Sequence, residues 1–179
     1  MTERIRARLL LLAAPTSYRV SAYRAAAARL GVELLVGSEG EYSLISQSRN
    51  GFRVFLQDFE ATLECVRNEI KCRPFNGVIA ADDSTVELTS RVARAIGLRH
   101  NPPKAALVSR RKDLGRQVLL AAGLPVPKFV RVDLSRNLSS QLQEVRFPCV
   151  AKPLALSGSR GVIRADDRLT LMRAVSRIQ

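Results

Sequence analysis

Residues 147–163 have the sequence FPCVAKPLALSGSRGVI, which predicts a buried strand, a loop of small residues and a second short strand. One lysine, Lys152, interrupts the apolar run of the first strand. Burying an unpaired ammonium group is costly, so we expect this lysine to have an anionic partner. The Ser/Gly loop at 157–161 can add backbone N–H donors, because glycine lets a backbone approach an anion closely. The stretch therefore predicts a phosphate site.

The loop alone does not identify its ligand. It is not a Walker A motif, because no Gly-Lys-Ser/Thr run opens a helix here. A tight hairpin, with Lys152 extended along apolar surface to reach water, remains as the structural alternative. Other segments of the chain are needed to distinguish a phosphate site from a hairpin.

The first hundred residues alternate apolar strands with helical segments, which predicts an α/β domain with a Rossmann-like, doubly wound and mainly parallel sheet. We expect strands at 8–14, 32–36, 52–56 and 77–81, helices at 17–30, 58–71 and 84–96, and irregular backbone at 41–51. Asp58 is the expected cap of the second helix, and Asp83 or Ser84 that of the third. No G-x-G-x-x-G run follows the first strand, which disfavours a dinucleotide site.

The pattern changes after Asn101-Pro102-Pro103, so we place a domain boundary at about residue 100 and expect domains at 1–100 and 101–179. The second domain is predicted to be a small α+β unit. Its expected elements are a helix at 104–122 broken near Ser109, an extended stretch at 124–132, a helix at 134–145, the strand–loop–strand above, and a last helix capped by Asp166 or Asp167.

The net charge of +13 is unevenly distributed. Residues 1–100 carry 14 Lys and Arg against 11 Asp and Glu, whereas residues 101–179 carry 15 against 5. Aromatic residues make up only 5% of the chain and do not alternate with the basic ones, which disfavours a surface for stacking nucleic-acid bases. A basic cleft for a polyphosphate fits the same charge.

Other classes of site find little support. The apolar run at 9–14 is too short to span a bilayer, so we expect no membrane segment and a cytoplasmic location. Three cysteines and one histidine give no zinc spacing, and we expect buried, reduced thiols. His100 is expected to pack at the domain junction. Asp82 and Asp83 follow a strand, where either substrate contact or helix capping would explain them.

Three segments together resemble the ATP-grasp superfamily, and specifically its carboxylate–amine ligases. Residues 112–127 (KDLGRQVLLAAGLPVP) are similar to that family's K-D-x-x-R helix with its extended exit. Residues 147–153 (FPCVAKP) and 157–162 (SGSRGV) are similar to its lysine strand and phosphate loop. The two lysines are 40 residues apart, as the family's pattern requires. Residues 1–100 resemble its pre-ATP-grasp domain.

The resemblance implies that ATP is bound with Mg²⁺ and that a carboxylate is activated as an acyl phosphate for attack by an amine. It assigns no catalytic residue and no metal ligand in this chain, and it assigns the phosphates of ATP to Lys112, Lys152, Ser157, Gly158, Ser159, Gly161 and Val162. We expect residues 101–179 to be the N-terminal lid part of the ATP-grasp domain, truncated before the metal-binding half, and the chain alone to be inactive. The alternative is a non-catalytic nucleotide- or partner-binding module completed by a separate C-terminal half or by a second copy. The sequence does not identify the carboxylate or the amine.

Overall fold

The structure is a computed structural model that describes residues 6–40 and 50–178. The chain divides into two compact units, residues 1–107 and residues 108–179. Of the stretch expected to be irregular at 41–51, residues 41–49 lie outside the described residues. The assignment of domains at 1–100 and 101–179 stays a prediction.

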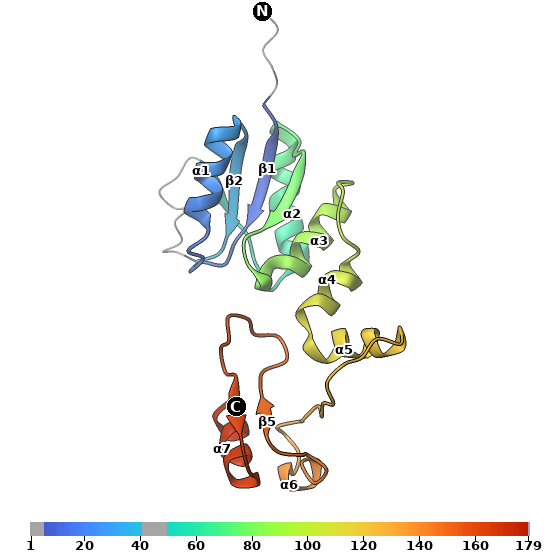
Figure 1. Cartoon of the computed structure of the whole chain (residues 1–179). Coiled ribbons are helices and arrows are strands. Elements are labelled where there is room, and N and C mark those ends of the chain that lie inside the picture. The colour runs from blue at the N-terminus through green and yellow to red at the C-terminus, as the bar shows by residue number, and fades with distance from the viewer. Residues whose placement is uncertain (1–5, 41–49, 179) are drawn as a thin grey trace, which may run out of the picture. The chain divides into compact units, whose positions relative to one another are not determined.

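The first unit is built on a four-stranded sheet with strand order β3-β2-β1-β4. Its strands are β1 (Arg8–Leu12), β2 (Glu33–Ser38), β3 (Gly51–Arg53) and β4 (Gly77–Ala80). Every pairing is parallel, and Leu10 of β1 lies between Leu35 of β2 and Val78 of β4. The predicted doubly wound α/β sheet is thereby confirmed (Figure 1).

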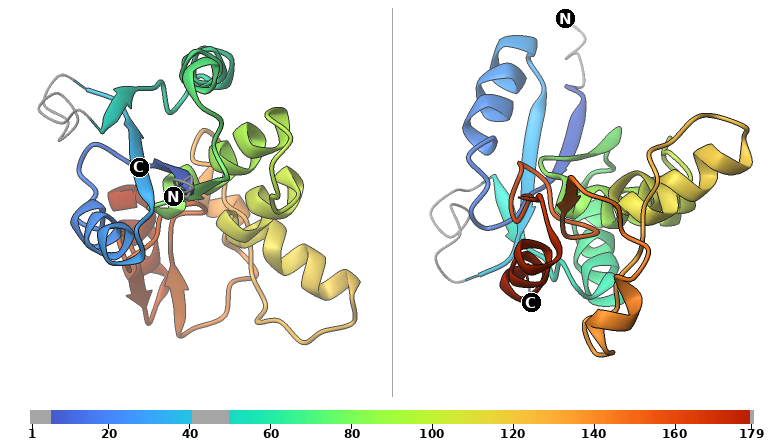
Figure 2. Two further views of the ribbon diagram at one scale, coloured as in Figure 1. Left: turned by 90° about the horizontal axis from the view of Figure 1, so that it is seen from above. Right: turned by 60° about the horizontal axis from the view of Figure 1, so that its bottom comes forward.

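Helices cover both faces of this sheet (Figure 2). They are α1 (Val20–Leu30), α2 (Phe59–Cys72) and α3 (Val86–Ala95), the last preceded by a 3₁₀ turn, η1 (Asp83–Thr85). Ala27 of α1 packs in one apolar cluster with Leu11, and Val66 of α2 packs in the other with Leu10. Successive side chains of a strand point to opposite faces, so the apolar run of β1 supplies both clusters.

The ends of α1 and α2 follow from local sequence. Asp58 caps α2 as predicted, since its side chain accepts a hydrogen bond from the Ala61 N–H at 3.0 Å. Gly31 ends α1 at a φ of 65°, a left-handed conformation that favours glycine.

The predicted cap of α3 is wrong, because neither Asp83 nor Ser84 caps that helix. Both belong to η1, which separates β4 from α3. The buried Thr85 hydroxyl donates to the carbonyl oxygens of Leu12 at 3.1 Å and Asp82 at 2.9 Å. This hydroxyl fixes the turn to the carboxyl end of β1, an anchor that sequence spacing does not reveal.

The second unit pairs a small antiparallel hairpin with helices. Its elements are α4 (Pro103–Arg110, which begins in the first unit), α5 (Lys112–Ala121), α6 (Leu138–Gln141), β5 (Cys149–Ala151), β6 (Ile163–Ala165) and α7 (Arg168–Ile178). Leu171 and Val175 of α7 pack on Ala165 of β6 and on Leu142. Asp167 accepts a hydrogen bond from the Thr170 N–H at 2.8 Å. Of the two residues predicted to cap α7, Asp166 and Asp167, the second is thereby confirmed.

Two expectations for this unit are wrong. The helix expected at 134–145 is reduced to α6, because Asp133 accepts hydrogen bonds from the backbone and hydroxyl of Ser135 and holds a turn there instead. The lysine strand is not buried: β5 ends at Ala151, one residue before Lys152, and Val150 is 54% exposed because its outer face is uncovered.

The cysteines are free thiols, but they are not all buried. Cys65 and Cys149 are half-buried and Cys72 is exposed, so the expectation of buried thiols is wrong for Cys72. Among the helices of the described residues, none has both the length and the apolar character needed to cross a membrane.

Candidate functional site

Lys112 is the first residue of α5 and lies against the chain segment that leads into the Ser/Gly loop. Its backbone N–H donates to the Leu154 carbonyl at 3.1 Å. Its Nζ donates to the Leu156 carbonyl at 2.5 Å and lies 3.5 Å from the Leu154 oxygen. The lysine thus connects the start of α5 to the backbone beside Ser157.

Lys152 lies directly after β5 and is half-buried. Burial lowers the pKa of its ammonium group from the ordinary value of 10.5, and the positive charges of Arg116 and Lys112 lower it further. Within residues 6–40 and 50–178, no hydrogen-bond acceptor or carboxylate pairs with this ammonium. Lys152 is therefore a partly desolvated cation that is available for an anion.

The loop after Lys152 has an unusual backbone. Gly158, Ser159 and Gly161 all have φ between 58° and 68°, and the Ser157 carbonyl accepts hydrogen bonds from both the N–H and the Nε of Arg160. The Ser159 carbonyl accepts one from the Val162 N–H at 3.3 Å. Backbone N–H groups in turn conformations can converge on one side of a loop, a geometry that favours anion binding.

Gly161 is favoured for two reasons, its left-handed φ and the lack of room for a side chain. A Cβ atom at this position would lie 2.9 Å from Cγ of Pro153, a residue that adjoins Lys152. Glycine therefore lets the far end of the loop close on the strand exit that carries the lysine. The structure brings Lys112, Lys152 and the end of the loop to neighbouring positions in one unit.

Asp113 has a structural role that the sequence analysis missed. It is 2% exposed and accepts two hydrogen bonds from Arg111, at 2.9 and 2.7 Å, while Nη1 of Arg131 lies 3.8 Å from it. The hydrogen bonds from Arg111 lower the pKa of the carboxyl group. A carboxylate in the first turn of a helix is an ordinary sequence signal, but the sequence does not show that Arg131 lies near it.

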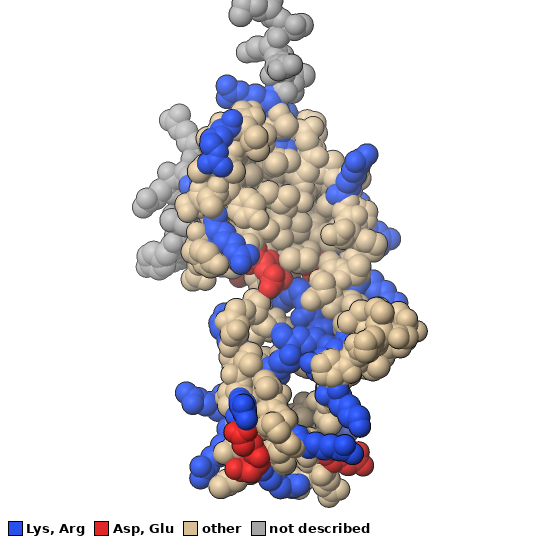
Figure 3. All heavy atoms as spheres, viewed as in Figure 1, with Lys and Arg blue, Asp and Glu red and all other residues tan. Residues whose placement is uncertain are grey.

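Arg116 is the arginine of the K-D-x-x-R pattern, and it is the second residue that the predicted site omits. It lies four positions after Lys112 on α5, and its guanidinium carbon is 5.3 Å from the ring centre of Phe129. The i, i+4 spacing on a helix is the signal that could have found it. On the face that Figure 3 shows, lysine and arginine outnumber acidic residues over this unit, in the lower part of the picture.

The candidate residues of the first unit differ in their contacts and exposure. Asp82, at the end of β4, accepts a hydrogen bond from the Ala14 N–H at 3.3 Å, whereas Asp83 is exposed. His100 is exposed, with Nδ1 2.9 Å from the Leu98 carbonyl, and its predicted packing role at the domain junction stays a prediction.

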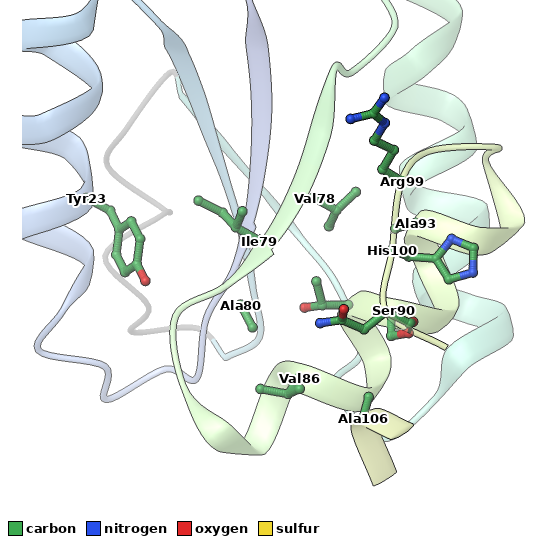
Figure 4. A pocket seen from close by; sticks show the side chains of 12 residues that line it. Tyr23, Val78, Ile79, Ala80, Val86, Ser90, Ala93, Arg99, His100 and Ala106 are labelled. Atoms are coloured by element: carbon green, nitrogen blue, oxygen red, sulfur yellow. Dashed lines mark hydrogen bonds between the residues drawn. The ribbon is translucent and has the colours of Figure 1, made fainter. Parts of the chain in front are cut away.

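A pocket of about 620 Å³ lies along β4 and α3 of the first unit (Figure 4). Its polar lining includes Thr89, Ser90, Arg99, His100 and Asn101. Among the residues that the structure describes, no cluster of three or more His, Cys, Asp or Glu side chains could hold a metal ion.

The comparisons with known proteins agree with the expected family. Residues 23–100 match the family model of the ATP-grasp N-terminal domain. The uncharacterised protein y4rH of Sinorhizobium fredii is 33% identical over 91 residues, which cover 51% of this chain and 19% of that protein.

Solved structures match nearly the whole chain. The L-amino acid ligase of Bacillus licheniformis has a TM-score of 0.76 at 25% identity, covering 97% of this chain and 42% of the ligase. The carboxyaminoimidazole ribonucleotide synthase of Aspergillus clavatus, complexed with ATP, has a TM-score of 0.68 at 15% identity, covering 94% of this chain and 44% of the synthase. This chain thus spans less than half the length of the proteins it matches.

These matches define the fold as that of the N-terminal part of ATP-grasp ligases. Residues 23–100 thus match the ATP-grasp N-terminal domain, and the fold of the chain is similar to that of ATP-grasp ligases. The assignment of Lys112, Lys152 and the loop at 157–162 to the phosphates of ATP stays a prediction.

Proposed function

We propose that this chain supplies the ATP-binding N-terminal part of a ligase that activates a carboxylate as an acyl phosphate for attack by an amine. One observation carries the proposal. Two half-buried lysines, Lys112 and Lys152, adjoin a Ser/Gly loop with left-handed backbone, and Lys152 has no partner among the described residues. A bound polyphosphate would satisfy both the lysine charge and the loop N–H groups.

In the proposed reaction a carboxylate oxygen attacks the γ-phosphorus of ATP, and the bond from that phosphorus to the bridging oxygen breaks to release ADP. The amine nitrogen then attacks the acyl carbon, loses a proton and expels inorganic phosphate. Lys112 and Lys152 would neutralise charge on the phosphate oxygens throughout, which is the main task of a protein in phosphoryl transfer. The loop at 157–162 would cover the phosphates and exclude water.

Mg²⁺ would neutralise phosphate charge in such a site and would need oxygen ligands from the protein. The described residues offer no cluster of carboxylates that fits a metal ion. The chemistry derived for this chain is therefore limited to binding and covering the phosphates.

Hydroxylamine gives a direct test of the ligase reaction, because it converts an acyl phosphate into a stable hydroxamate. L-amino acids are the first carboxylates to try, since the L-amino acid ligase is the structure at 25% identity. We expect ATP binding by the 179-residue chain, and ATP-dependent hydroxamate in a reaction that contains the complete ATP-grasp domain. ATP binding that never yields hydroxamate, alone or with a co-purified partner chain, would favour a non-catalytic nucleotide-binding module. Absence of ATP binding at millimolar concentration would overturn the proposal.

A further inference from the structure

Arg116 completes a group of three cations around the start of α5 and the end of β5. Lys112 and Arg116 lie four positions apart on α5, so their side chains share one face of the helix. Lys112 reaches the carbonyls of Leu154 and Leu156, just beyond Lys152. The positive charge of Arg116 also acts on Lys152 directly, since it is among the causes that lower the pKa of that lysine.

The guanidinium of Arg116 is held by an aromatic ring rather than by a carboxylate. Its central carbon lies 5.3 Å from the ring centre of Phe129, and both side chains are half-buried. Stacking on a ring leaves the edge of the guanidinium plane free, and this edge carries the N–H donors. Arg116 is therefore oriented without using its hydrogen-bonding capacity.

The nearest carboxylate in sequence does not compensate these charges. Asp113 is buried against Arg111, with two hydrogen bonds, and its remaining cationic neighbour is Arg131. In the part of the chain that the structure describes, none of Lys112, Arg116 and Lys152 forms an ion pair with a carboxylate. Three like charges at close quarters repel one another unless an anion lies between them.

We propose that Arg116 is a third phosphate-contacting residue, which makes the site selective for a nucleoside di- or triphosphate over a monophosphate. This inference rests on the proposed function and adds to it the residue that reads the length of the phosphate chain. A guanidinium matches two phosphate oxygens at once, whereas the two lysines act as point charges. Loss of the Arg116 contact should therefore weaken the binding of a nucleotide more when the nucleotide carries more phosphate charge near Arg116.

The test compares the affinities of ATP, ADP and AMP for the 179-residue chain by isothermal titration at fixed ionic strength. The wild-type chain binds ATP and ADP more tightly than AMP. Arg116→Ala weakens ATP binding about tenfold or more, the usual loss for a charge-assisted hydrogen bond, and leaves AMP nearly unchanged. Arg116→Lys restores only part of this loss, because an ammonium cannot form the paired contact. The Phe129→Leu variant keeps the charge of Arg116 but loses the stacking. Its affinity for ATP lies between those of the Arg116→Ala and Arg116→Lys variants.

Arg91→Ala is the matched control. Arg91 also lies over an aromatic ring, with its guanidinium carbon 4.0 Å from the ring centre of Phe59, but it belongs to the first unit. This substitution removes the same charge and the same kind of contact, and we expect it to leave all three nucleotide affinities unchanged.

The two proposals fail in different ways. If the wild-type chain binds ATP no more tightly than AMP, the proposed function is contradicted. If it prefers ATP and the Arg116→Ala variant keeps the full preference, the role of Arg116 is overturned while the proposed function stands. Circular dichroism checks that each variant is folded, and if Arg116→Ala unfolds, the Arg116→Lys and Phe129→Leu affinities decide the question.

Discussion

The two units of the chain treat buried positive charge in opposite ways. In the first unit Arg8 is 7% exposed, and its guanidinium pairs with Glu33 at 3.1 Å and with Glu69 at 3.1 Å. In the second unit the half-buried Lys152 faces other cations and has no partner in the described residues. The difference separates a charge that stabilises the fold from one that needs a ligand.

Removing Arg8 should have the largest effect on stability. Arg8→Ala leaves Glu69 without its cation and Glu33 with Arg73 alone, and it removes the contact between the guanidinium and Phe75. We expect the free energy of unfolding to fall by about 3 kcal/mol, as when one partner of a buried ion pair is lost. Urea titration followed by circular dichroism measures this. Arg29→Ala, at an exposed position on α1, is the control, and equal stability of the two variants would contradict the structural role of Arg8.

Removing Lys152 should act on binding rather than on folding. Lys152→Ala is expected to weaken ATP binding by about 2 kcal/mol, roughly 30-fold, because a charge-assisted contact to phosphate is lost. Stability should stay the same or rise slightly, since a desolvated cation without a partner is removed. Lys128→Ala, which removes an exposed lysine of the same unit, should leave affinity unchanged. Equal affinities of the two variants would argue against a phosphate site at Lys152.

Asp113 should make stability depend on acid pH. Its pKa is lowered by hydrogen bonds from Arg111, so its contribution is present above the unfolded-state value of about 3.9 and is lost as pH falls through the lower folded-state value. We expect Asp113→Asn to cost about 1–2 kcal/mol at neutral pH. Unfolding measured from pH 7 to pH 2 should show the difference shrinking below about pH 4. A difference that stays constant over this range would mean that Arg111 does not stabilise the charged form.

Alanine substitutions of the loop glycines should have the smallest effect on ATP binding. They distinguish a steric requirement for glycine from a requirement for left-handed backbone. Gly158 and Gly161 have φ of 65° and 68°, but only Gly161 would bring a Cβ against Pro153. Alanine at either site costs about 1 kcal/mol for the left-handed backbone. Gly161→Ala should weaken ATP binding more than Gly158→Ala, because the loop must also move away from Pro153. Equal affinities of these variants would show that closure on Pro153 is irrelevant to binding.

Much of the fold could be predicted from the sequence because its signals are local. Apolar runs such as 8–14, the cap at Asp58 and the glycine at Gly31 predicted the strands and helices of the first unit. The helix expected at 134–145 failed because Asp133 and Ser135 form a competing turn. Propensity over a short window could not weigh that turn against a helix.

The candidate site likewise has a part that the sequence predicted and a part that it did not. Lys112, Lys152 and the loop were predicted from motifs, although their role in binding ATP remains untested. Asp113 and Arg116 belong to the K-D-x-x-R pattern, but their contacts with the distant residues Arg131 and Phe129 could not be predicted from it. Burial and aromatic stacking of this kind become visible only when the chain is folded.

The contrast between the two units can be tested by titrating the isotope-labelled 179-residue chain with ATP and following each backbone amide by NMR. The account predicts shifts that are largest at residues 157–162 and around Lys112 and Lys152, and weaker shifts with AMP. In the first unit, the amides around Arg8 should not move. Shifts confined to residues 6–40 and 50–107, or equal shifts with ATP and AMP, would contradict the claim that the cations of the second unit bind the phosphates.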